Sequence, residues 1–468
     1  MIRRTKIIAT LGPATDSPEM IGRLLDAGMN IARLNMSHSA HDWVRKTVKY
    51  LREAAAARNI PVGILMDTQG PSIRTGNLPV PLDLQPGQAF TFTVRGEKSE
   101  ELYSVDVNYD NFINDIHVGD TVLLDNGDIR MKVISKEGNH IRCEVLTPGK
   151  LGSRRHINLP GVKVSLPPLT AKDLQDIALG VEMGVDYIAL SFVREASDLR
   201  ELRAQLSEAK RPPLVIAKIE DQQAVKNISS IIAEADAVMV ARGDLGIECP
   251  YEELPIIQRK VVKACLRLGK PVIVATHMLE SMIHSPMPTR AEITDVANAV
   301  YEQSDAIMLS GETTVGKYPI QCVEVFDRIA RRIERSGGAN YHQKAELVTA
   351  RQKLIKSAVV MGDQLLAEAI IVFTRRGTMA RYASWLRPQH SCVLAICEDS
   401  GVAEQLTLNW GVRAMVYSFD YERSEITVER TLASLLEKGI LHKGNTVVIV
   451  SPITSGEQMF DAVQMRVL

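Results

Sequence analysis

Residues 214–221, LVIAKIED, decide the fold class and raise a question about chemistry. The run from Leu214 to Ile219 is mostly apolar, which is typical of a strand buried on both faces of a parallel sheet. Lys218 and Glu220 interrupt and end this run, and side chains two residues apart in a strand point to the same face. An ammonium and a carboxylate therefore project together from an interior strand, although a buried charge is costly unless it is paired or bound to a metal.

Seven other continuous apolar runs of strand length accompany this one. The eight runs begin at Lys6, Ile31, Val62, Tyr187, Leu214, Ala237, Pro271 and Ala306. Helical patterns separate them, and Thr170 with Asp173 and Thr289 with Glu292 resemble capping boxes at helix starts. Eight strand–helix units predict a (β/α)8 TIM barrel, and an open doubly wound sheet is the alternative.

The segment between the third and fourth runs has a different pattern. AFTFTVRG, YSVDV, TVLLDNGDIRMKVIS and HIRCEVLTPG alternate between apolar and polar residues, and DNGD is typical of a hairpin turn. We therefore expect residues 71–158 to form a small β-barrel lid domain. This lid is inserted in a loop of the barrel domain, which comprises residues 1–70 and 159–338.

A further α/β pattern follows the Ser-Gly-Gly sequence at residues 336–338, which is typical of a linker. Apolar runs again alternate with helical patterns, and they begin at Ala369, Cys392, Arg413 and Thr446. Residues 345–468 are therefore expected to form a C-terminal α/β regulatory domain.

Composition narrows the classes of function. The 468 residues carry a net charge of −1, which argues against a broad nucleic-acid-binding surface. No run approaches the roughly 20 apolar residues that a membrane-spanning helix needs. The six cysteines include no CxxC pair, so we expect reduced thiols in a cytoplasmic protein.

Polar residues gather at the carboxyl ends of the predicted strands, where barrel enzymes have their active sites. They are Arg33, Asn35, Ser37, His38, Asp67, Thr68, Lys218, Glu220, Arg242, Gly243, Asp244, Thr276, His277, Ser310 and Glu312. Glu220 and Asp244 follow neighbouring strands, and two carboxylates with substrate oxygens and water suit Mg²⁺. A salt bridge between Lys218 and Glu220 is the alternative for that pair.

Three other features at these strand ends suit anionic ligands. Arg33 is a candidate clamp for a phosphate or carboxylate, although a lone arginine at a barrel rim also forms structural ion pairs. Residues 242–249, RGDLGIEC, predict a short helix whose free N–H groups suit an anion, with a plain turn as the alternative. Thr276 offers a strand-end hydroxyl. His38 and His277 are expected to be hydrogen-bonded rather than metal ligands, because neither has a second histidine at ligand spacing.

These motifs together resemble the pyruvate kinase family. They are TKIIATLGPAT, GMNIARLNMSH, LMDTQGPSIRTG, INLPGV, AKIED, VMVARGDLGIE, ATHMLESMIHSPMPTRAEITDVANAV and MLSGETTVGKYP. The match runs in order over the whole chain, and it is weaker in the C-terminal domain. The resemblance implies a glycolytic transferase that moves the phosphoryl group of phosphoenolpyruvate to ADP, giving pyruvate and ATP. It also implies Mg²⁺ and K⁺ as cofactors, a sugar-phosphate effector and a homotetramer.

The resemblance further implies roles for single residues. Glu220 and Asp244 would hold Mg²⁺, Lys218 would face the transferring phosphoryl group and the enolate, and Thr276 would lie near the protonated carbon. The implied catalytic and substrate-binding residues are Arg33, Lys218, Gly243, Asp244 and Thr276. The implied nucleotide-binding residues are Asn35, His38, Arg74 and Arg155, with Arg155 reaching in from the lid. The implied monovalent-cation residues are Asn35, Ser37, Asp67 and Thr68.

The C-terminal domain carries a candidate effector loop. It comprises Thr374, Arg375, Arg376, Gly377 and Thr378, between a predicted strand and helix. This is a phosphate-cradle arrangement, and it resembles the sugar-phosphate loop of the family, although Met379 stands where a hydroxyl residue is common.

The chain departs from the common family pattern at several positions. Gln69 and Ser72 replace the usual Lys and Glu, Asp221 replaces Asn, His277 replaces Gln and Ser39 replaces Gly. Without a carboxylate at Ser72, we expect K⁺ to activate the protein without being tightly held.

Two other functions compete with the kinase. An Mg²⁺-dependent pyruvate or enolpyruvate lyase on the same barrel would explain Lys218, Glu220 and Asp244, but not the inserted β domain or the C-terminal domain. A catalytically silent sugar-phosphate sensor would not need these residues or Thr276 to be intact.

Overall fold

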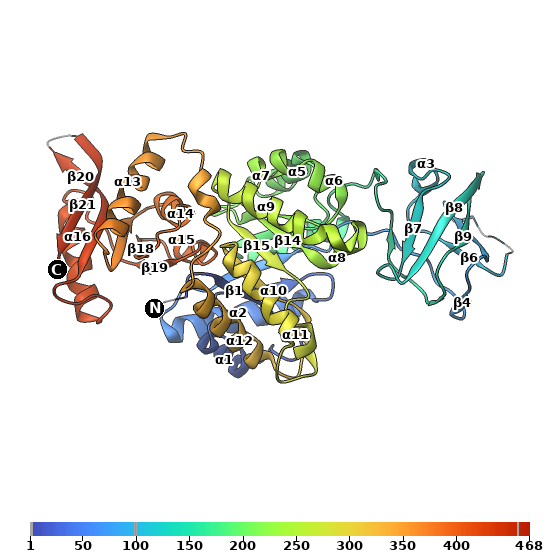
Figure 1. The fold of residues 1–468 in the computed structure, drawn as a ribbon, viewed down its shortest axis with the longest axis horizontal. Coiled ribbons are helices and arrows are strands. Elements are labelled where there is room, and N and C mark those ends of the chain that lie inside the picture. The colour runs from blue at the N-terminus through green and yellow to red at the C-terminus, as the bar shows by residue number, and fades with distance from the viewer. Residues whose placement is uncertain (1–2, 98, 100, 456–457) are drawn as a thin grey trace.

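The computed structural model describes residues 3–97, 99, 101–455 and 458–468. Three bodies lie in a row, with a barrel in the middle, a β-sheet body at one end and an α/β body at the other (Figure 1). Within these residues, no helix combines the length and the apolar character needed to cross a membrane.

The middle body is a closed barrel of eight parallel strands, which confirms the predicted barrel and excludes an open sheet. Its strands are β1 (Lys6–Thr10), β2 (Ile31–Asn35), β3 (Gly63–Asp67), β12 (Tyr187–Leu190), β13 (Leu214–Ile219), β14 (Ala237–Ala241), β15 (Val272–Ala275) and β16 (Ala306–Leu309). The strands are nearly all buried along their length, because helices cover the outside and side chains fill the inside. Ile8, Leu65, Met239 and Ile273 belong to the cluster that fills the interior.

Helices surround the barrel in the expected alternation. They are α1 (Pro18–Ala27), α2 (His41–Arg58), α4 (Ala171–Glu182), α5 (Ala196–Gln205), α6 (Gln222–Lys226), α7 (Ile228–Glu234), α8 (Arg242–Glu248), α9 (Leu254–Leu268), α10 (Arg290–Tyr301), α11 (Gly311–Thr314) and α12 (Pro319–Glu334). Short 3₁₀ turns are η1 (Tyr251–Glu253), η2 (Glu280–Ile283) and η3 (Tyr341–Lys344). The capping boxes predicted at Thr170 and Thr289 are both present, and they fix where α4 and α10 begin.

The inserted β domain follows β3. Its elements are β4 (Leu82–Leu84), β5 (Ala89–Thr93), β6 (Ser104–Asp106), α3 (Phe112–Asp115), β7 (Thr121–Leu124), β8 (Ile129–Glu137), β9 (His140–Val145), β10 (Gly149–Leu151) and β11 (Ile157–Asn158). The expected small β barrel takes the form of a six-stranded and a two-stranded sheet around one core. The DNGD hairpin joins β7 to β8 as predicted, with Asp125, Asn126 and Gly127 all at positive φ.

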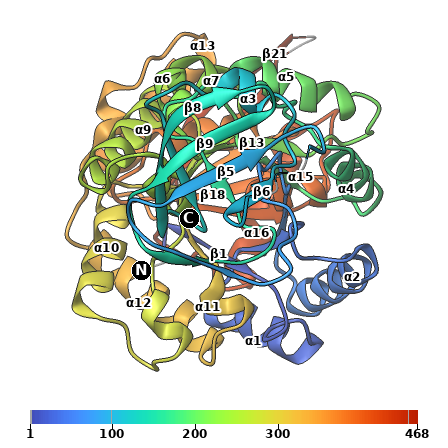
Figure 2. The same cartoon turned by 90° about the vertical axis from the view of Figure 1, so that its right-hand side faces the viewer.

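The inserted domain lies over the carboxyl ends of the barrel strands. Figure 2 views the molecule from this side, with β5, β8 and β9 in front of the barrel. The outgoing and returning segments lie side by side, since Arg74 forms a bridge with His156 and the Thr75 N–H donates to the Arg155 carbonyl at 2.9 Å. The domain is therefore attached through one narrow pair of segments.

The C-terminal body is a five-stranded sheet with helices. Its elements are α13 (Ala350–Gln364), β17 (Ala369–Phe373), α14 (Thr378–Trp385), β18 (Cys392–Cys397), α15 (Ser400–Gln405), β19 (Val412–Val416), α16 (Ser424–Glu437), β20 (Thr446–Ser455) and β21 (Gln458–Val467). The strand order is β19-β18-β17-β20-β21, and β21 is an antiparallel edge strand. The predicted α/β domain is therefore present.

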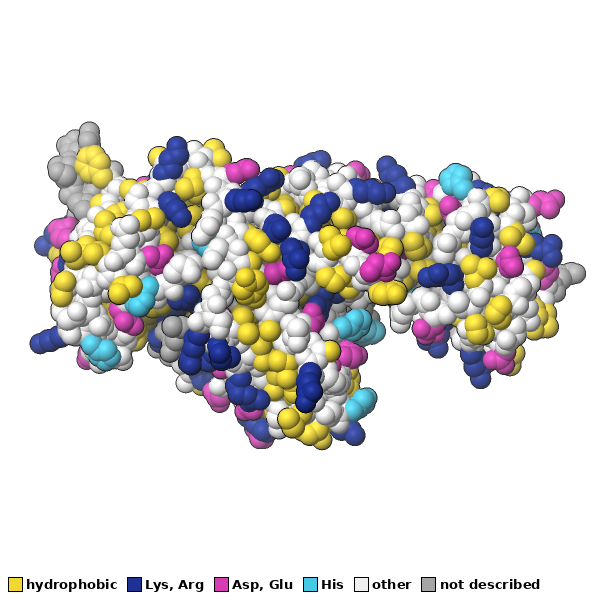
Figure 3. Space-filling model, viewed as in Figure 1, with side chains coloured by type: hydrophobic (Ala, Val, Ile, Leu, Met, Phe, Trp, Pro, Cys, Tyr) yellow, Lys and Arg dark blue, Asp and Glu magenta, His cyan; other side chains and the backbone are white. Residues whose placement is uncertain are grey.

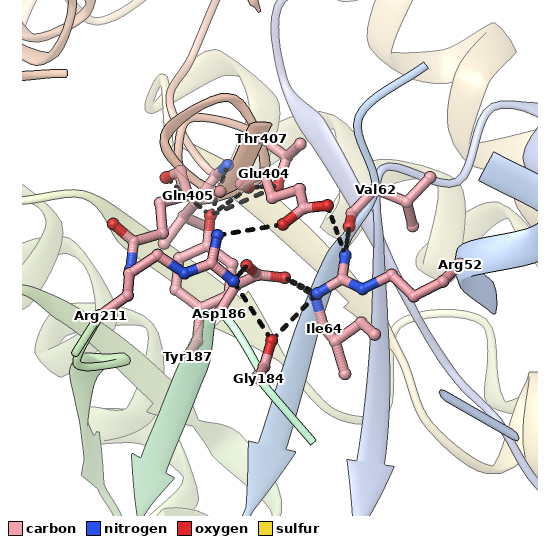
Figure 4. Close-up of polar contacts among 12 residues, drawn as sticks. Arg52, Val62, Ile64, Gly184, Asp186, Tyr187, Arg211, Glu404, Gln405 and Thr407 are labelled. Carbon is pink, nitrogen blue, oxygen red and sulfur yellow. Dashed lines mark hydrogen bonds and ion pairs between the residues drawn. The ribbon is translucent and has the colours of Figure 1, made fainter. Parts of the chain in front are cut away.

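A polar cluster around the buried Asp186 joins the C-terminal body to the amino-terminal face of the barrel (Figure 4). Asp186, just before β12, pairs with Arg52 at 3.1 Å and with Arg211 at 3.6 Å. Glu404 of α15 pairs with the same two arginines at 3.0 and 3.3 Å. The Tyr187 hydroxyl also donates to the last carbonyl of α15 at 2.8 Å. These contacts bind the two bodies on the side opposite the inserted domain.

Candidate active site

Lys218 lies at the centre of the polar rim that the strand ends form. It is 8% exposed, and its ammonium donates to the Ser191 hydroxyl at 2.8 Å. It also forms ion pairs with Glu220 Oε1 at 2.8 Å and Asp67 Oδ1 at 3.1 Å. Burial alone would lower the pKa of Lys218, but the two carboxylates outweigh burial and raise the pKa above its usual value. The Lys218 side chain is therefore positively charged, and its three contacts fix the orientation of the ammonium.

Asp67, at the end of β3, joins Lys218 to Arg33. Its Oδ2 accepts from Arg33 Nε at 2.7 Å, and Arg33 Nη1 donates to the Thr10 hydroxyl at 3.0 Å. Burial would raise the pKa of Asp67, but Lys218 and Arg33 hold it below the usual value. Both carboxylate oxygens of Asp67 therefore face protein cations, so a metal ion would have to share them.

Glu220 follows β13 directly and is buried. Its Oε2 accepts from the backbone N–H of Phe192 at 2.6 Å, while Oε1 faces Lys218. Phe192 adopts a positive φ of 55°, which is unusual for an aromatic residue. Burial raises the pKa of Glu220 to about 7, and the nearby negative charge of Asp244 adds to this effect while Lys218 opposes it. Glu220 and Asp244 thus form a site of concentrated negative charge.

Thr276 and Gly243 meet on the other side of this site. The Thr276 hydroxyl accepts from the Gly243 N–H at 2.7 Å and donates to the Ala275 carbonyl at 2.7 Å. Thr276 has a φ of 70°, which strains a β-branched residue. Arg242 donates to the Thr276 carbonyl at 2.7 Å and pairs with Asp295 at 2.6 Å. The arginine therefore holds the strained turn that presents the hydroxyl.

A cavity of about 290 Å³ lies beside this cluster, between the barrel and the segment returning from the inserted domain. Phe192 and Glu248 line it on the barrel side, and His156 and Asn158 line it on the other. Burial raises the pKa of Glu248 to about 7, although Asn158 donates to it at 2.9 Å. The rim therefore adjoins a partly open cavity that faces the segment returning from the inserted domain.

The residues that the resemblance implies for binding the nucleotide and the monovalent cation lie around the same rim. Most of them form hydrogen bonds with residues other than Lys218. Asn35 accepts from the Ser37 N–H at 3.2 Å, and Ser37 and His38 are exposed. The Thr68 hydroxyl donates to the Ala189 carbonyl at 3.1 Å. Of this set, only Asp67 contacts Lys218 directly among the residues that the structure describes.

The two arginines implied for the nucleotide lie at and beyond the segments that connect the inserted domain. Arg74 donates to the Ser72 hydroxyl at 3.2 Å and to the Arg154 carbonyl at 3.1 Å. Arg155 is exposed and pairs with Asp125 of the hairpin at 3.3 Å, not with a barrel residue. Arg155 therefore faces the inserted domain in this structure.

The candidate effector loop lies far from this rim, in the C-terminal body. Gly377 takes a φ of 78° and caps α14. Thr374 and Arg375 line a small hollow of about 60 Å³, and the Arg375 guanidinium lies 4.4 Å from the centre of the Tyr421 ring. The loop thus has the glycine turn and positive charge that its sequence predicted.

Three contacts at the rim were not anticipated from the sequence. Ser191 binds the Lys218 ammonium, the Phe192 N–H binds Glu220, and Asp295 fixes Arg242. A signal existed for Ser191, because it follows the apolar run that begins at Tyr187 and so lies at a strand end. The sequence held no signal for the Phe192 backbone or for Asp295.

Comparisons with known proteins agree with this geometry. Residues 2–323 match the family model of the pyruvate kinase barrel domain, and residues 352–464 match the pyruvate kinase alpha/beta domain. The chain belongs to the pyruvate kinase family.

Similar proteins extend over nearly the whole chain. Plastidial pyruvate kinase 2 of Arabidopsis thaliana is 42% identical over 453 residues, which cover 96% of this chain and 78% of that protein. A pyruvate kinase of Staphylococcus aureus is 39% identical over 469 residues, which cover 97% of this chain and 79% of that protein. The crystal structure of a pyruvate kinase from Cryptosporidium parvum superposes with a TM-score of 0.94 at 35% identity, covering 99% of this chain and 96% of that chain.

Membership of the pyruvate kinase family confirms the expected enzyme class and activity. The chain is a phosphotransferase with pyruvate kinase activity, and glycolysis is the pathway that the family implies. The family acts on phosphoenolpyruvate and ADP and requires a divalent metal ion.

Proposed function

We propose that the rim around Lys218 is where the phosphoryl group passes from phosphoenolpyruvate to ADP. The observation that carries this proposal is the Lys218 ammonium, held 2.8 Å from both Glu220 and Ser191 at the end of β13. Phosphoryl transfer depends on positioning and on neutralising charge. A charged, pre-oriented lysine in a water-poor site suits the transferring phosphoryl group and the enolate that forms.

Glu220 and Asp244 are the residues that we propose hold Mg²⁺. The donor set fits this ion, because carboxylate oxygens are its preferred protein ligands and substrate oxygens and water complete its coordination. Burial raises the pKa of Glu220, and nearby negative charge that Lys218 does not fully offset contributes to this rise. When bound, Mg²⁺ would supply further positive charge opposite the phosphoryl oxygens.

The metal proposal has a test that does not depend on turnover. Mn²⁺ binding, followed by electron paramagnetic resonance, should weaken strongly in Glu220→Gln and in Asp244→Asn. Glu248→Gln, which changes a buried carboxylate lining the neighbouring cavity, should leave it within about twofold. Unchanged binding in the first two variants would overturn the assignment.

Gly243, Thr276 and Arg33 are proposed to bind phosphoenolpyruvate. A side chain at Gly243 would place a Cβ 3.5 Å from the Thr276 hydroxyl, so glycine keeps this space open for the substrate carboxylate. The Thr276 hydroxyl, held by Arg242, is proposed to lie near the carbon that receives a proton. Arg33, already oriented by Asp67, is proposed to bind phosphoryl oxygens.

The nucleotide is proposed to bind along the side of the rim that faces the inserted domain. Asn35, His38 and Arg74 would contact ADP from the barrel and the connecting segment. Arg155 would have to exchange Asp125 for the nucleotide phosphates, which requires the inserted domain to move toward the rim. Such closure would exclude water, which otherwise competes for the phosphoryl group.

We propose that K⁺ binds among Asn35, Ser37, Asp67 and Thr68. Their oxygen atoms suit a hard cation, but Asp67 is the single carboxylate and both its oxygens already face Arg33 or Lys218. With Ser72 in place of a second carboxylate, the ion is expected to be held weakly.

We further propose that the loop from Thr374 to Thr378 binds a sugar phosphate. Support comes from the Gly377 turn, the start of α14 and the exposed charge of Arg375. Calorimetric titration with sugar mono- and bisphosphates should show binding that Thr378→Glu abolishes. If no sugar phosphate binds, or if the variant binds normally, the loop is only structural.

A homotetramer is our proposal for the assembly. Met287, Ile293 and Tyr301 are exposed apolar residues in and before α10, and Figure 3 shows hydrophobic side chains gathered over α10 and α11. Phe460 and Val467 are exposed on the edge strand β21 of the other body. A tetramer of two-fold symmetry needs two different self-complementary faces, and these are two such candidates. Analytical ultracentrifugation would test this proposal.

We also infer a reducing compartment, because all six cysteines are free thiols and five of them are buried. The cytoplasm satisfies this condition, and so does the plastid for which the Arabidopsis and tobacco relatives are named. The partners proposed are the two substrates, the effector and further copies of the chain, without nucleic acid or membrane.

One coupled assay tests the proposed reaction. ADP and phosphoenolpyruvate are supplied with Mg²⁺, and pyruvate and ATP are measured together. Equal formation of both products is expected. Pyruvate without ATP would point to phosphatase or lyase chemistry, and no product with retained sugar-phosphate binding would point to a silent sensor.

A further inference from the structure

A second cavity, of about 280 Å³, lies at the opposite end of the barrel from the Lys218 rim. It is a partly open cavity between the amino-terminal ends of the barrel strands and helix α14 of the C-terminal body. Asp236 and Lys270 line it from the barrel, and Thr378 and Arg381 line it from α14. Of the residues that line this cavity, only Thr378 has a role in the proposals above, as the last residue of the candidate effector loop.

Arg381, like Lys270 in the same lining, carries a positive charge and forms no ion pair with any residue that the structure describes. Its guanidinium makes one hydrogen bond, to the Arg376 carbonyl at 3.3 Å, and within the part of the chain that the structure describes it forms no ion pair. Burial lowers the pKa of Arg381, and the electrostatic effects of the nearby Tyr187 hydroxyl and Asp236 carboxylate only partly oppose this shift. Arg381 is half-buried, and a single hydrogen bond leaves most of its N–H donors free, so a carboxylate or phosphate would complete its contacts.

Asn409 supplies a second, independent sign of a ligand. It lines the same cavity and is only 3% exposed, yet its side-chain amide makes no hydrogen bond with any residue that the structure describes. The amide atoms are not among the polar atoms that are sealed from solvent, so they are open to a hydrogen bond from the cavity side. Gln352, also in the lining, uses its amide oxygen to accept from the Val348 and Thr349 N–H groups, which leaves its NH₂ group as a donor.

The remaining polar groups of the cavity indicate the charge distribution that a suitable ligand would have. The Lys270 ammonium donates to the Ala235 carbonyl at 2.6 Å and contributes positive charge. Asp236 accepts from the Val215 N–H at 2.8 Å and pairs with Arg203 at 3.0 Å, so it places hydrogen-bond acceptors on the barrel side. A ligand with one anionic end and hydroxyl groups at the other matches this distribution.

We propose that this cavity binds a small hydroxylated oxyanion, a carboxylate or a phosphate ester, with Arg381 as the anion-binding group and Asn409 as a second contact. The site is separate from the hollow at Thr374 and Arg375. It is nevertheless connected to the loop there, because Arg381 donates to the Arg376 carbonyl within that loop. A bound anion would compete for this guanidinium and release the carbonyl.

Titration of the full chain tests the site with two probes, inorganic phosphate and L-malate, to distinguish the two anion classes. Trp385 lines the cavity, so its fluorescence reports occupancy there, and its contribution is identified by comparison with Trp385→Phe. Arg381→Gln should weaken binding roughly tenfold to a hundredfold, as expected for loss of a charge-assisted contact. Arg375→Gln removes the same charge from the other hollow and should change the affinity by less than about twofold.

The outcomes separate the possibilities. Loss of binding in Arg381→Gln with retention in Arg375→Gln supports the proposal, and the probe that binds identifies the anion class. The reverse pattern, equal loss in both variants, or no saturable signal with either probe overturns it. If thermal unfolding shows that Arg381→Gln does not fold, Asn409→Leu replaces it, and wild-type affinity in that variant overturns the proposal.

Discussion

Replacing Lys218 by methionine tests the chemistry proposed for the rim. The substitution keeps the length and apolar stem of the side chain but removes the ammonium that contacts Ser191, Glu220 and Asp67. Loss of one preorganised charge at a reacting oxyanion typically costs 10²- to 10³-fold in kcat, or roughly 3–4 kcal/mol. We expect kcat to fall by at least this factor.

The same substitution will also lower stability, and the assay has to separate the two effects. Lys218 is 8% exposed, and its removal leaves the buried Glu220 without its cation, while Asp67 keeps Arg33. Breaking a buried ion pair from one side costs about 3–5 kcal/mol. The free energy of unfolding should therefore fall by a similar amount, and the pKa of Glu220 should rise further.

Lys6→Met is the matched control. Lys6 is 7% exposed and lies at the other end of the barrel, where its ammonium donates to the Val412 carbonyl at 2.6 Å. Burial lowers its pKa to about 7, so it too is a buried lysine held by protein contacts. This variant should change the free energy of unfolding but leave kcat within about twofold of the wild type.

Both variants are assayed for coupled ATP and pyruvate formation at a temperature where circular dichroism shows each to be folded. If folded Lys218→Met keeps kcat within tenfold of the wild type, Lys218 is not the charge that stabilises the transition state. If Lys6→Met loses activity equally, the effect is one of stability, and the assignment fails for that reason.

Other perturbations test the surroundings of the site. Arg242→Gln and Asp295→Asn should each lower kcat, roughly tenfold to a hundredfold for the former, because the strained Thr276 turn loses its support; normal kcat in both would contradict this role. K⁺ should raise activity relative to tetramethylammonium at matched ionic strength, because Ser72 supplies no ammonium in its place; equal rates and substrate affinities would refute K⁺ activation. Burial lowers the pKa of His342 from 6.5 to about 4, so its contribution to stability is complete above pH 6.5 and is lost as the pH falls toward 4. Urea unfolding at pH 7 and pH 5 should differ by on the order of 2 kcal/mol from this group, and an undiminished difference in His342→Gln would disprove its source.

The fold was largely predictable because its signals are local. Each of the eight barrel strands carries a continuous apolar run, and the capping boxes at Thr170 and Thr289 lie within four residues of chain. The inserted domain was recognisable from its alternating pattern and its DNGD turn. Its division into a six-stranded and a two-stranded sheet was not, because strand pairing depends on contacts between distant segments.

The site was predictable only in part. The spacing of Lys218 and Glu220 in one strand fixed their proximity, and the salt bridge considered as the alternative is present in the structure. Asp67 was assigned to a monovalent cation by resemblance, yet its two oxygens bind Arg33 and Lys218. Such partner choices depend on how β3, β2 and β13 are placed around the barrel, and no short stretch of sequence encodes that placement.

The way in which the inserted domain is attached bears on how such a chain can arise and be altered. Because Arg74 bridges to His156 and Thr75 bonds to Arg155, the domain is inserted through one pair of adjacent segments in the loop between β3 and α4. Its two ends could be joined by a short turn without stretching any barrel strand. A gene could therefore gain, lose or exchange this domain in one event. After such a loss the eight-stranded barrel would remain closed, but the carboxyl ends of its strands would no longer be covered by the inserted domain. The attachment is thus a point at which the chain divides into two parts with separate hydrophobic cores.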